Sequence, residues 1–190
     1  MEILILNGSI HGGSGNCGNL IRELQRRRRD IHWKVVHLSR TKFGPALAKR
    51  IAKSSAVLFL TGTYWDSWGS PLQNFLEEAT VLEARPEILG KPAGVAVLMH
   101  SVGGKAVLSR LQGVLSTMGF LLPPMSGMVY SLSAQLALQS KSAQAEDFWG
   151  PGDLDVIVEN LVSAAQLSVN WKVWPVDRKN FRKKWVNPRK

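Results

Sequence analysis

The residues best able to do chemistry form a glycine-rich segment from Asn7 to Asn19. It follows an apolar run at 3–6 and precedes apolar residues spaced like one helix face, so we expect strand, loop and helix. Glycines let the backbone approach a ligand, and the helix start supplies N–H groups and a positive dipole end. This arrangement favours a bound anion, most naturally a phosphate. The loop residues expected to contact it are Ser9, His11, Ser14, Gly15, Asn16 and Cys17.

This segment resembles three known phosphate-binding loops, and the spacing of its residues argues against each of them. Residues 13–18 match G-x-G-x-x-G, but six residues separate them from the strand, and no acid ends the next strand. A Walker loop needs a lysine, which this segment lacks. A phosphatase loop needs five residues between cysteine and arginine, whereas four separate Cys17 from Arg22. A simple glycine-rich connection remains a structural alternative.

Two further segments follow apolar runs later in the chain. Residues 61–69 contain two tryptophans and a tyrosine, and residues 100–104 contain a serine and a Gly-Gly pair. If the preceding strands are parallel, all three segments leave carboxyl ends of strands and converge on one crevice. The later segments add candidate ligand contacts at Gly62, Thr63, Tyr64, Trp65, Ser101, Gly103 and Gly104.

Few other side chains in these segments are chemically reactive. Cys17 stands at a helix N-terminus, where its thiol pKa could be lowered, or where it simply takes the place of a small residue. His11 and His100 suit hydrogen bonding to a ligand better than proton donation. We nominate no catalytic residue, and no Cys/His spacing indicates a metal site.

Strands that alternate with helices must position these segments. The sequence predicts a three-layer α/β sandwich, with a five-stranded parallel sheet in the order 2-1-3-4-5 and helices on both faces. A fifth strand is expected at 120–122, with a continuation at 128–130 left open, and residues 131–152 receive no assignment. The other expected strands are 2–6, 32–38, 56–60 and 94–99, and the expected helices are 17–29, 45–53, one opening at 71, 105–118 and 153–169.

Composition favours one domain, which we place at 1–170. The chain has 190 residues, 45% of them hydrophobic, enough for a full core. No apolar run reaches the roughly 18 residues of a transmembrane segment. The single cysteine excludes an internal disulfide, and the absence of a basic leader leads us to expect a cytoplasmic, reduced protein.

The positive charge is concentrated at the end of the chain. Residues 171–190 hold eight Lys and Arg against one acid, which is +7 of the net charge of +10. Four tryptophan or phenylalanine side chains alternate with these cations. The tail could contact nucleic acid or an anionic surface. We favour instead an arm that packs its aromatic side chains on the body or on a neighbouring subunit. The run 26–29 of four arginines is expected to be a solvated helix end.

These motifs resemble the flavodoxin-like, NAD(P)H-dependent FMN reductase family. The family loop reads Gly-Ser, several residues, then Ser or Gly, Asn and Thr, as Gly8-Ser9 and Gly15-Asn16-Cys17 do here. Its second loop reads Thr-Pro-x-Tyr-Trp followed by Leu-Lys-Asn-Phe, and this chain has TGTYW at 61–65 and LQNF at 72–75. A Ser-x-Gly-Gly loop is shared at 101–104. The differences are His11 for Arg, Cys17 for Thr and Gly62 for Pro.

The resemblance spans residues 1–125 and implies a bound FMN and NAD(P)H as co-substrate. The FMN phosphate would lie in the first loop. The isoalloxazine ring would lie beside residues 62–65, and the pyrimidine edge of that ring beside residues 101–104. Hydride would pass from nicotinamide to flavin and on to a small acceptor such as free flavin or a quinone. A homodimer or homotetramer is also implied. Two alternatives stay open, namely a flavin-binding electron carrier and a non-catalytic interaction protein that uses the basic tail.

Overall fold

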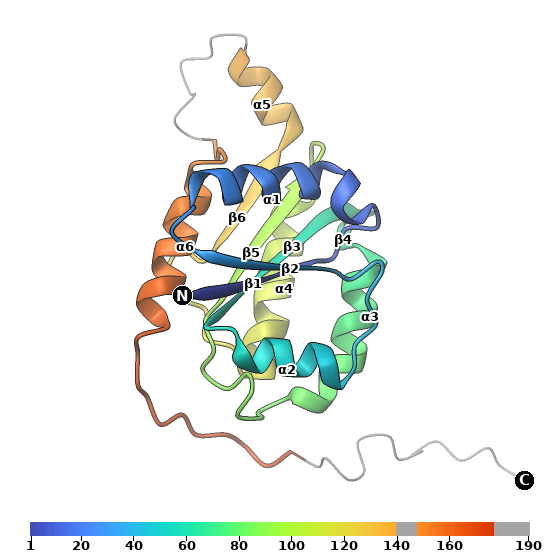
Figure 1. Ribbon diagram of the computed structural model, residues 1–190. Helices are drawn as coiled ribbons and strands as arrows, with labels where there is room; N and C mark the ends of the chain where they lie inside the picture. The colour runs from blue at the N-terminus through green and yellow to red at the C-terminus, as the bar shows by residue number, and fades with distance from the viewer. Residues whose placement is uncertain (140–147, 177–190) are drawn as a thin grey trace, which may run out of the picture.

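Five parallel strands form the centre of the computed structural model, which describes residues 1–139 and 148–176 (Figure 1). Their order is β2-β1-β3-β5-β6, and a short sixth strand, β4, pairs antiparallel with β3. This confirms the predicted order 2-1-3-4-5, because β4 is a side branch of the sheet. The bounds are β1 (Glu2–Asn7), β2 (His32–His37), β3 (Ala56–Tyr64), β4 (Ser67–Trp68), β5 (Ala93–Met99) and β6 (Gly127–Ser131).

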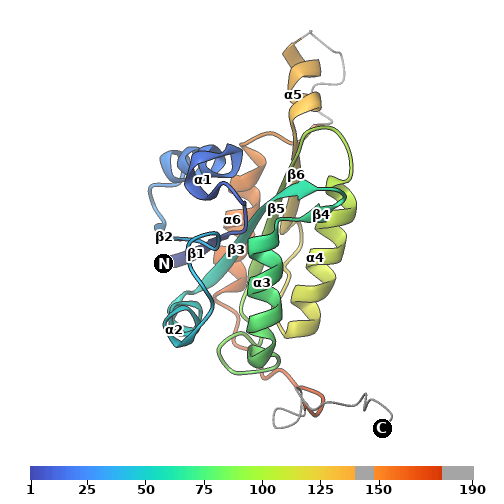
Figure 2. The same ribbon diagram turned by 90° about the vertical axis from the view of Figure 1, so that its right-hand side faces the viewer.

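Helices cover both faces of the sheet (Figure 2). One face carries α1 (Asn16–Arg27) and α6 (Asp153–Ala164), and the other carries α2 (Pro45–Lys53), α3 (Ser70–Glu78) and α4 (Gly104–Met118). The remaining elements are α5 (Leu132–Gln139), which projects beyond the end of β6, and two short 3-10 turns, η1 (Gly12–Ser14) and η2 (Ala79–Leu82). Within the described ranges, none of these helices is both long and apolar enough to cross a bilayer.

Successive side chains along each strand point to opposite faces of the sheet, so the protein has two apolar cores, one on each face. In β3, Leu58 packs in the core beneath α1 and α6, whereas Phe59 packs in the core beneath α2, α3 and α4. Phe59 is fully buried and meets Phe120 edge-on, with ring centroids 5.5 Å apart. Burial on both faces explains why the strand is continuously apolar in sequence.

The predicted fifth strand at 120–122 is wrong. Only Leu121 makes a bridge there, to Pro92, and the strand is β6, which includes the continuation left open at 128–130. Two consecutive prolines remove backbone donors at 123–124, and Met125 has a φ of 52°. Regular pairing with β5 begins only at Gly127, opposite Val95.

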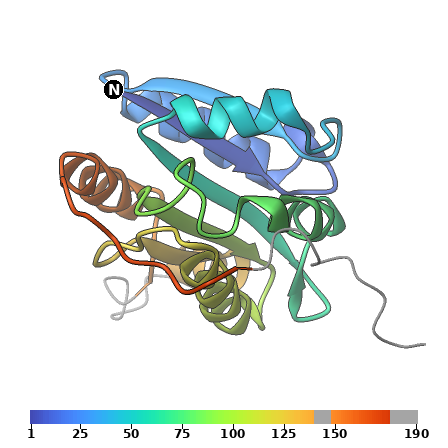
Figure 3. The same ribbon diagram turned by 90° about the horizontal axis from the view of Figure 1, so that it is seen from below.

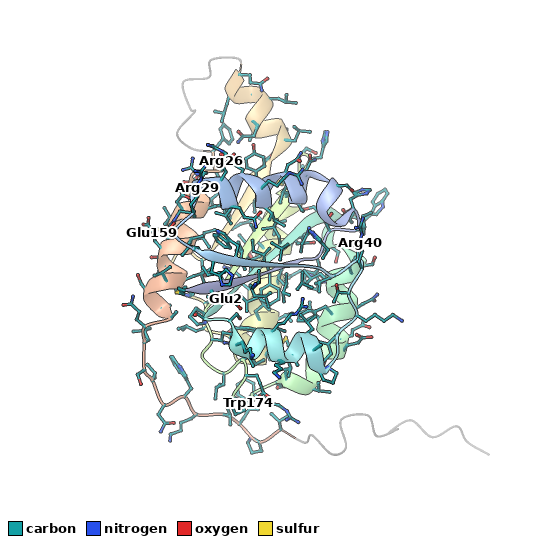
Figure 4. The ribbon with its side chains drawn as sticks, in the orientation of Figure 1. Glu2, Arg26, Arg29, Arg40, Glu159 and Trp174 are labelled. Carbon is teal, nitrogen blue, oxygen red and sulfur yellow. The ribbon has the colours of Figure 1, made fainter. Side chains whose placement is uncertain are left out.

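Two predicted helix ends are also longer than the observed ones. The first helix ends at Arg27 rather than residue 29, and the last ends at Ala164 rather than residue 169. Beyond α1, the Arg28 guanidinium bonds Asp30, 2.8 Å away. Arg27 forms an ion pair with Asp155 of α6. Figure 4 shows that the end of α1 also lies close to Glu159, which belongs to α6. The arginine run therefore joins two helices as well as facing solvent.

The first residues of the basic tail lie against the body. After α6 the chain runs beneath the sheet (Figure 3). A Cβ atom added to Gly90 would lie 2.3 Å from Trp171 Cδ1, so this ring covers the glycine directly. The indole N–H of Trp174 donates to Glu83 Oε1 over 3.3 Å. Both rings touch the body on one side and remain 42% and 59% exposed, respectively. The aromatic residues Phe181 and Trp185 lie outside the described residues.

Candidate functional site

A cavity of about 570 Å³ opens at the carboxyl edge of the sheet. Its size lies within the range of small-molecule sites. We expected the segments that follow three strands to converge, and each of them contributes residues to this cavity. The lining residues are Ser9, His11, Asn16, Cys17, Asn19, Leu20 and Glu23 near the first loop, Gly62, Thr63 and Tyr64 on β3, Leu98, Met99 and His100 after β5, and Tyr130, Leu132 and Pro151.

Seven of the thirteen predicted contact residues line this cavity, namely Ser9, His11, Asn16, Cys17, Gly62, Thr63 and Tyr64. The other six do not, and they are Ser14, Gly15, Trp65, Ser101, Gly103 and Gly104. Ser14 instead supports the loop, because its hydroxyl donates to the carbonyl oxygen of His11 over 2.8 Å. The first loop and the end of β3 therefore form the core of the candidate site.

Asn7, the last residue of β1, holds the first loop in shape. Its side chain is fully buried. The carboxamide oxygen accepts the Ser9 N–H at 3.0 Å, and the amide nitrogen donates to the Gly12 carbonyl at 2.8 Å. The same nitrogen lies 3.0 Å from His37 Nδ1 at the end of β2. One side chain thus joins both ends of the loop to the neighbouring strand.

The first turn of α1 supplies the donors that an anion needs. The first intrahelical bond runs from Asn19 N–H to the Gly15 carbonyl, so N–H groups before Asn19 have no acceptor within the helix. Gly15 occupies the N-cap position and has no side chain that could cap them. The Arg22 guanidinium bonds the Gly13 carbonyl at 3.0 Å and fixes the loop above this turn. These groups fit a phosphate.

Cys17 is a buried structural residue. Burial raises the pKa of its thiol to about 11, and a hydrogen bond with Ser9 opposes only part of that rise. The possibility of a lowered pKa at the helix N-terminus is therefore wrong. Desolvation outweighs the helix dipole because only 3% of the residue is exposed. The thiol acts as a small side chain in the wall of the cavity.

The aromatic segment is a hairpin rather than a loop. β3 continues to Tyr64, and a two-residue turn, Trp65 and Asp66 with φ of 48° and 56°, leads into β4. Trp65 is fully exposed at the tip, while Tyr64 faces the cavity. Thr63 borders the same cavity, but alternation along β3 turns its side chain to the opposite face of the sheet, toward Gly103 and the paired Trp68.

The loop after β5 lies beside the hairpin. A Cβ atom on Gly103 would lie 2.0 Å from Asp66 Oδ1 at the hairpin tip, so the two segments touch. The Gly104 N–H points toward Met99 Sδ at 3.3 Å. Ser101 lines a second cavity, described below. The two later segments are therefore brought together, although the Gly-Gly pair does not reach the main cavity.

Sequence reasoning missed several contributors. Tyr130 and Leu132 line the cavity because β6 begins seven residues later than expected, and Pro151 comes from a segment without an assignment. Asn7 and His37 were also missed, since they act through the loop and not on the cavity surface. An Asn at the end of a strand, directly before Gly-Ser, was the available signal.

His37 gives the loop a pH dependence. Burial, followed by repulsion from Arg40, lowers the pKa of His37 below its usual 6.5. The folded state therefore binds this proton less readily than the unfolded chain, so His37 contributes stability above pH 6.5 that is lost as pH falls through its folded pKa. We expect the free energy of unfolding to decrease as pH falls from 7 through the lowered pKa of His37. In His37→Gln, this decrease should be smaller.

Urea unfolding at several pH values measures this effect. His32→Gln, which removes an exposed histidine at the start of β2 together with its 3.2 Å contact to Glu2, is the comparison for losing a histidine away from the loop. Gln at position 37 retains an acceptor for the Asn7 amide while removing the titration. Identical pH dependence in wild type and His37→Gln would contradict the assigned role.

Comparisons with known proteins agree on the fold. A sequence model of the family described as NADPH-dependent FMN reductase matches residues 1–134. Among solved structures, RosB with bound 8-demethyl-8-formylriboflavin-5′-phosphate is similar at 14% identity and a TM-score of 0.69, covering 87% of this chain and 79% of that one. FerB from Paracoccus denitrificans, a flavoenzyme NAD(P)H:(acceptor) oxidoreductase, is similar at 19% identity and a TM-score of 0.60, covering 86% and 98%. An archaeal flavodoxin is similar at 12% identity and a TM-score of 0.58, covering 87% and 97%. No curated protein matches the sequence.

Proposed function

The chain belongs to the NADPH-dependent FMN reductase family, and we propose that it passes hydride from nicotinamide to a bound FMN and on to a small acceptor. Family membership makes it an FMN-dependent oxidoreductase with NAD(P)H as co-substrate. The observation that carries the proposal is the cavity where the ends of β1, β3 and β5 meet. Its anion-binding loop fits a flavin phosphate at one end, and Gly62 and Tyr64 on β3 offer a surface for a ring system at the other.

The first loop would hold the phosphate. Ser9, His11 and Asn16 line this end of the cavity, beside the first turn of α1 with its unpaired N–H groups. Glu23, the one acid among the described residues that line the cavity, is bonded to Arg26 at 2.7 Å, so its charge is balanced beside the anion. Cys17 limits the size of the pocket and stays protonated at neutral pH, because its pKa is about 11.

The end of β3 would hold the ring system. Gly62 lies so close to Tyr64 that an added Cβ would be 3.1 Å from the tyrosine ring, so the absence of a side chain lets Tyr64 turn along the strand. Flavin itself supplies the hydride and electron chemistry, and the protein supplies binding and orientation. No side chain is required as a general acid or base.

The proposal also covers the electron acceptor, the oligomeric state, the cellular location and the tail. The acceptor is free flavin, a quinone or another small compound. The loop with Ser101, Gly103 and Gly104 lies beside the hairpin and outside the main cavity, so we assign it no contact with the flavin. The chain acts as a homodimer or homotetramer in the cytoplasm, with residues 1–170 as the flavin domain. The arm at 171–176 has a packing role, which its contacts with Gly90 and Glu83 support.

The visible spectrum of the protein tests the proposal directly. We expect bands of oxidised flavin after FMN is added and the excess removed, and loss of those bands when NADPH is added without air. Reoxidation by free flavin or a quinone then identifies the acceptor. Retained flavin that NADPH leaves unchanged would support an electron carrier. No retained flavin would reject the cofactor assignment and favour a non-catalytic protein.

A further inference from the structure

A second cavity, of about 450 Å³, lies across the strand ends from the first. Alternation along β5 and β6 separates the two. Leu98 and Tyr130 face the first cavity, whereas Val129 and Ser131 face the second, and only Met99 borders both. The second cavity is therefore adjacent to the flavin site but faces the opposite side of the sheet, near the start of α4.

Three elements build the walls of this cavity. Lys105, in the first turn of α4, places Nζ 5.6 Å from the ring centre of Trp149. The Trp149 carbonyl accepts a hydrogen bond from Gln135 of α5 at 3.0 Å. The next N–H, of Gly150, donates to Asp153 of α6 at 2.7 Å. Trp149 is thus held by both neighbouring helices and by the lysine.

The lining has a simple chemistry. Lys105 is the only charged side chain that borders the cavity among the described residues. Phe148 and Trp149 provide aromatic surface, and both are more than one third exposed. Ser101, Ser131 and Ser133 provide hydroxyl groups. A planar aromatic ligand with a negative group fits this combination, because the ring can pack on the aromatic side chains and the anion can pair with the lysine.

We propose that this cavity binds the adenosine half of NADPH and that Lys105 contacts the 2′-phosphate, which makes Lys105 a specificity residue for NADPH over NADH. The inference rests on the proposed function, because it places the second half of the hydride donor. The charge of the cavity suits a phosphate, and its border with the first cavity at Met99 lets one extended ligand occupy both.

The position of the cavity argues against a small electron acceptor as its occupant. An acceptor must contact the flavin, but residues 99–101 form the border between the cavities. A dinucleotide has a reacting half and a separate recognition half, so it can cross this border. Binding energy from the non-reacting half then contributes to hydride transfer by orienting the other half.

Binding and turnover test the inference separately. Adenosine 2′,5′-bisphosphate and AMP are the binding probes, used with the FMN-loaded full-length protein. Wild type should bind the bisphosphate at least about tenfold more tightly than AMP, since a charge-assisted contact of this kind is worth about one order of magnitude. Lys105→Met should remove this preference, and Lys105→Arg should retain most of it. Trp149→Leu should weaken both probes, because both contain adenine.

The ratio of kcat/KM for NADPH to that for NADH is the second measurement. Lys105→Met should lower this ratio about tenfold, equivalent to one lost charge-assisted contact. Lys49→Met, an exposed lysine on α2, is the matched control and should leave the ratio unchanged. Equal affinity of wild type for the two probes, or a ratio unaffected by Lys105→Met, would overturn the inference. If no variant oxidises NADPH yet the probes still depend on Lys105, the subsite stands and the proposed electron transfer fails.

Discussion

Gly18→Ala is expected to abolish retention of FMN and to destabilise the protein. Gly18 lies in the first turn of α1, beneath the anion-binding loop. A Cβ atom at this position would lie 2.0 Å from the Gly13 carbonyl oxygen and 2.5 Å from its carbon. Backbone atoms cannot move aside as a flexible side chain can, so the loop segment around Gly13 must shift away from the start of α1. Alanine normally stabilises a helix by up to about 1 kcal/mol relative to glycine, and here the clash reverses that sign.

Absorbance of bound flavin after dialysis and the urea unfolding midpoint measure these two effects. Gly113→Ala is the matched control, because Gly113 is also inside a helix, α4, but an added Cβ would meet no atom within 4 Å. It should retain FMN and gain roughly 0.5–1 kcal/mol in the free energy of unfolding. Wild-type FMN retention by Gly18→Ala would show that the loop can move away without losing the anion site.

The order of the sheet could be predicted because the apolar runs are unambiguous. Ile3 to Leu6 and Ala56 to Leu60 are continuous, as strands buried on both faces must be, and helices of suitable length separate the strands. The fifth strand was misplaced because Phe120 to Leu122 is equally apolar. Phe120 is buried by packing and Leu121 makes only one bridge, to Pro92, so this run is apolar without continuing as a strand, and a hydrophobic pattern does not distinguish the two cases.

Parts of the candidate site depend on contacts that have no local pattern. The Gly-Ser motif and the aromatic run indicated which segments meet, because they follow strands at the same edge. Trp65 and Tyr64 could not be told apart in sequence, since their orientation depends on a two-residue turn in which both residues have positive φ. Tyr130 required the correct register of β6. The pKa of Cys17 required its burial to be known, because burial and the helix dipole act in opposite directions.

Asn7→Ala is expected to cost about 3 kcal/mol of stability and to weaken FMN binding strongly. The substitution removes the acceptor of the Ser9 N–H and the donor to the Gly12 carbonyl, and both of these residues are buried. Each buried polar group left without a partner costs roughly 1–3 kcal/mol. The lost contact to His37 also separates the loop from β2. The loop then no longer presents the start of α1 to an anion.

Asn7→Asp separates the two roles of the carboxamide. Aspartate retains an acceptor for the Ser9 N–H but has no donor for the Gly12 carbonyl, and it places a buried negative charge beneath a site that must accept an anion. FMN affinity should therefore fall further in Asn7→Asp than in Asn7→Ala, as flavin fluorescence titration would measure. Asn74→Ala, at an exposed position on α3, is the control and should match wild type. Higher FMN affinity in Asn7→Asp than in Asn7→Ala would show that the shape of the loop matters more to the phosphate than the local charge.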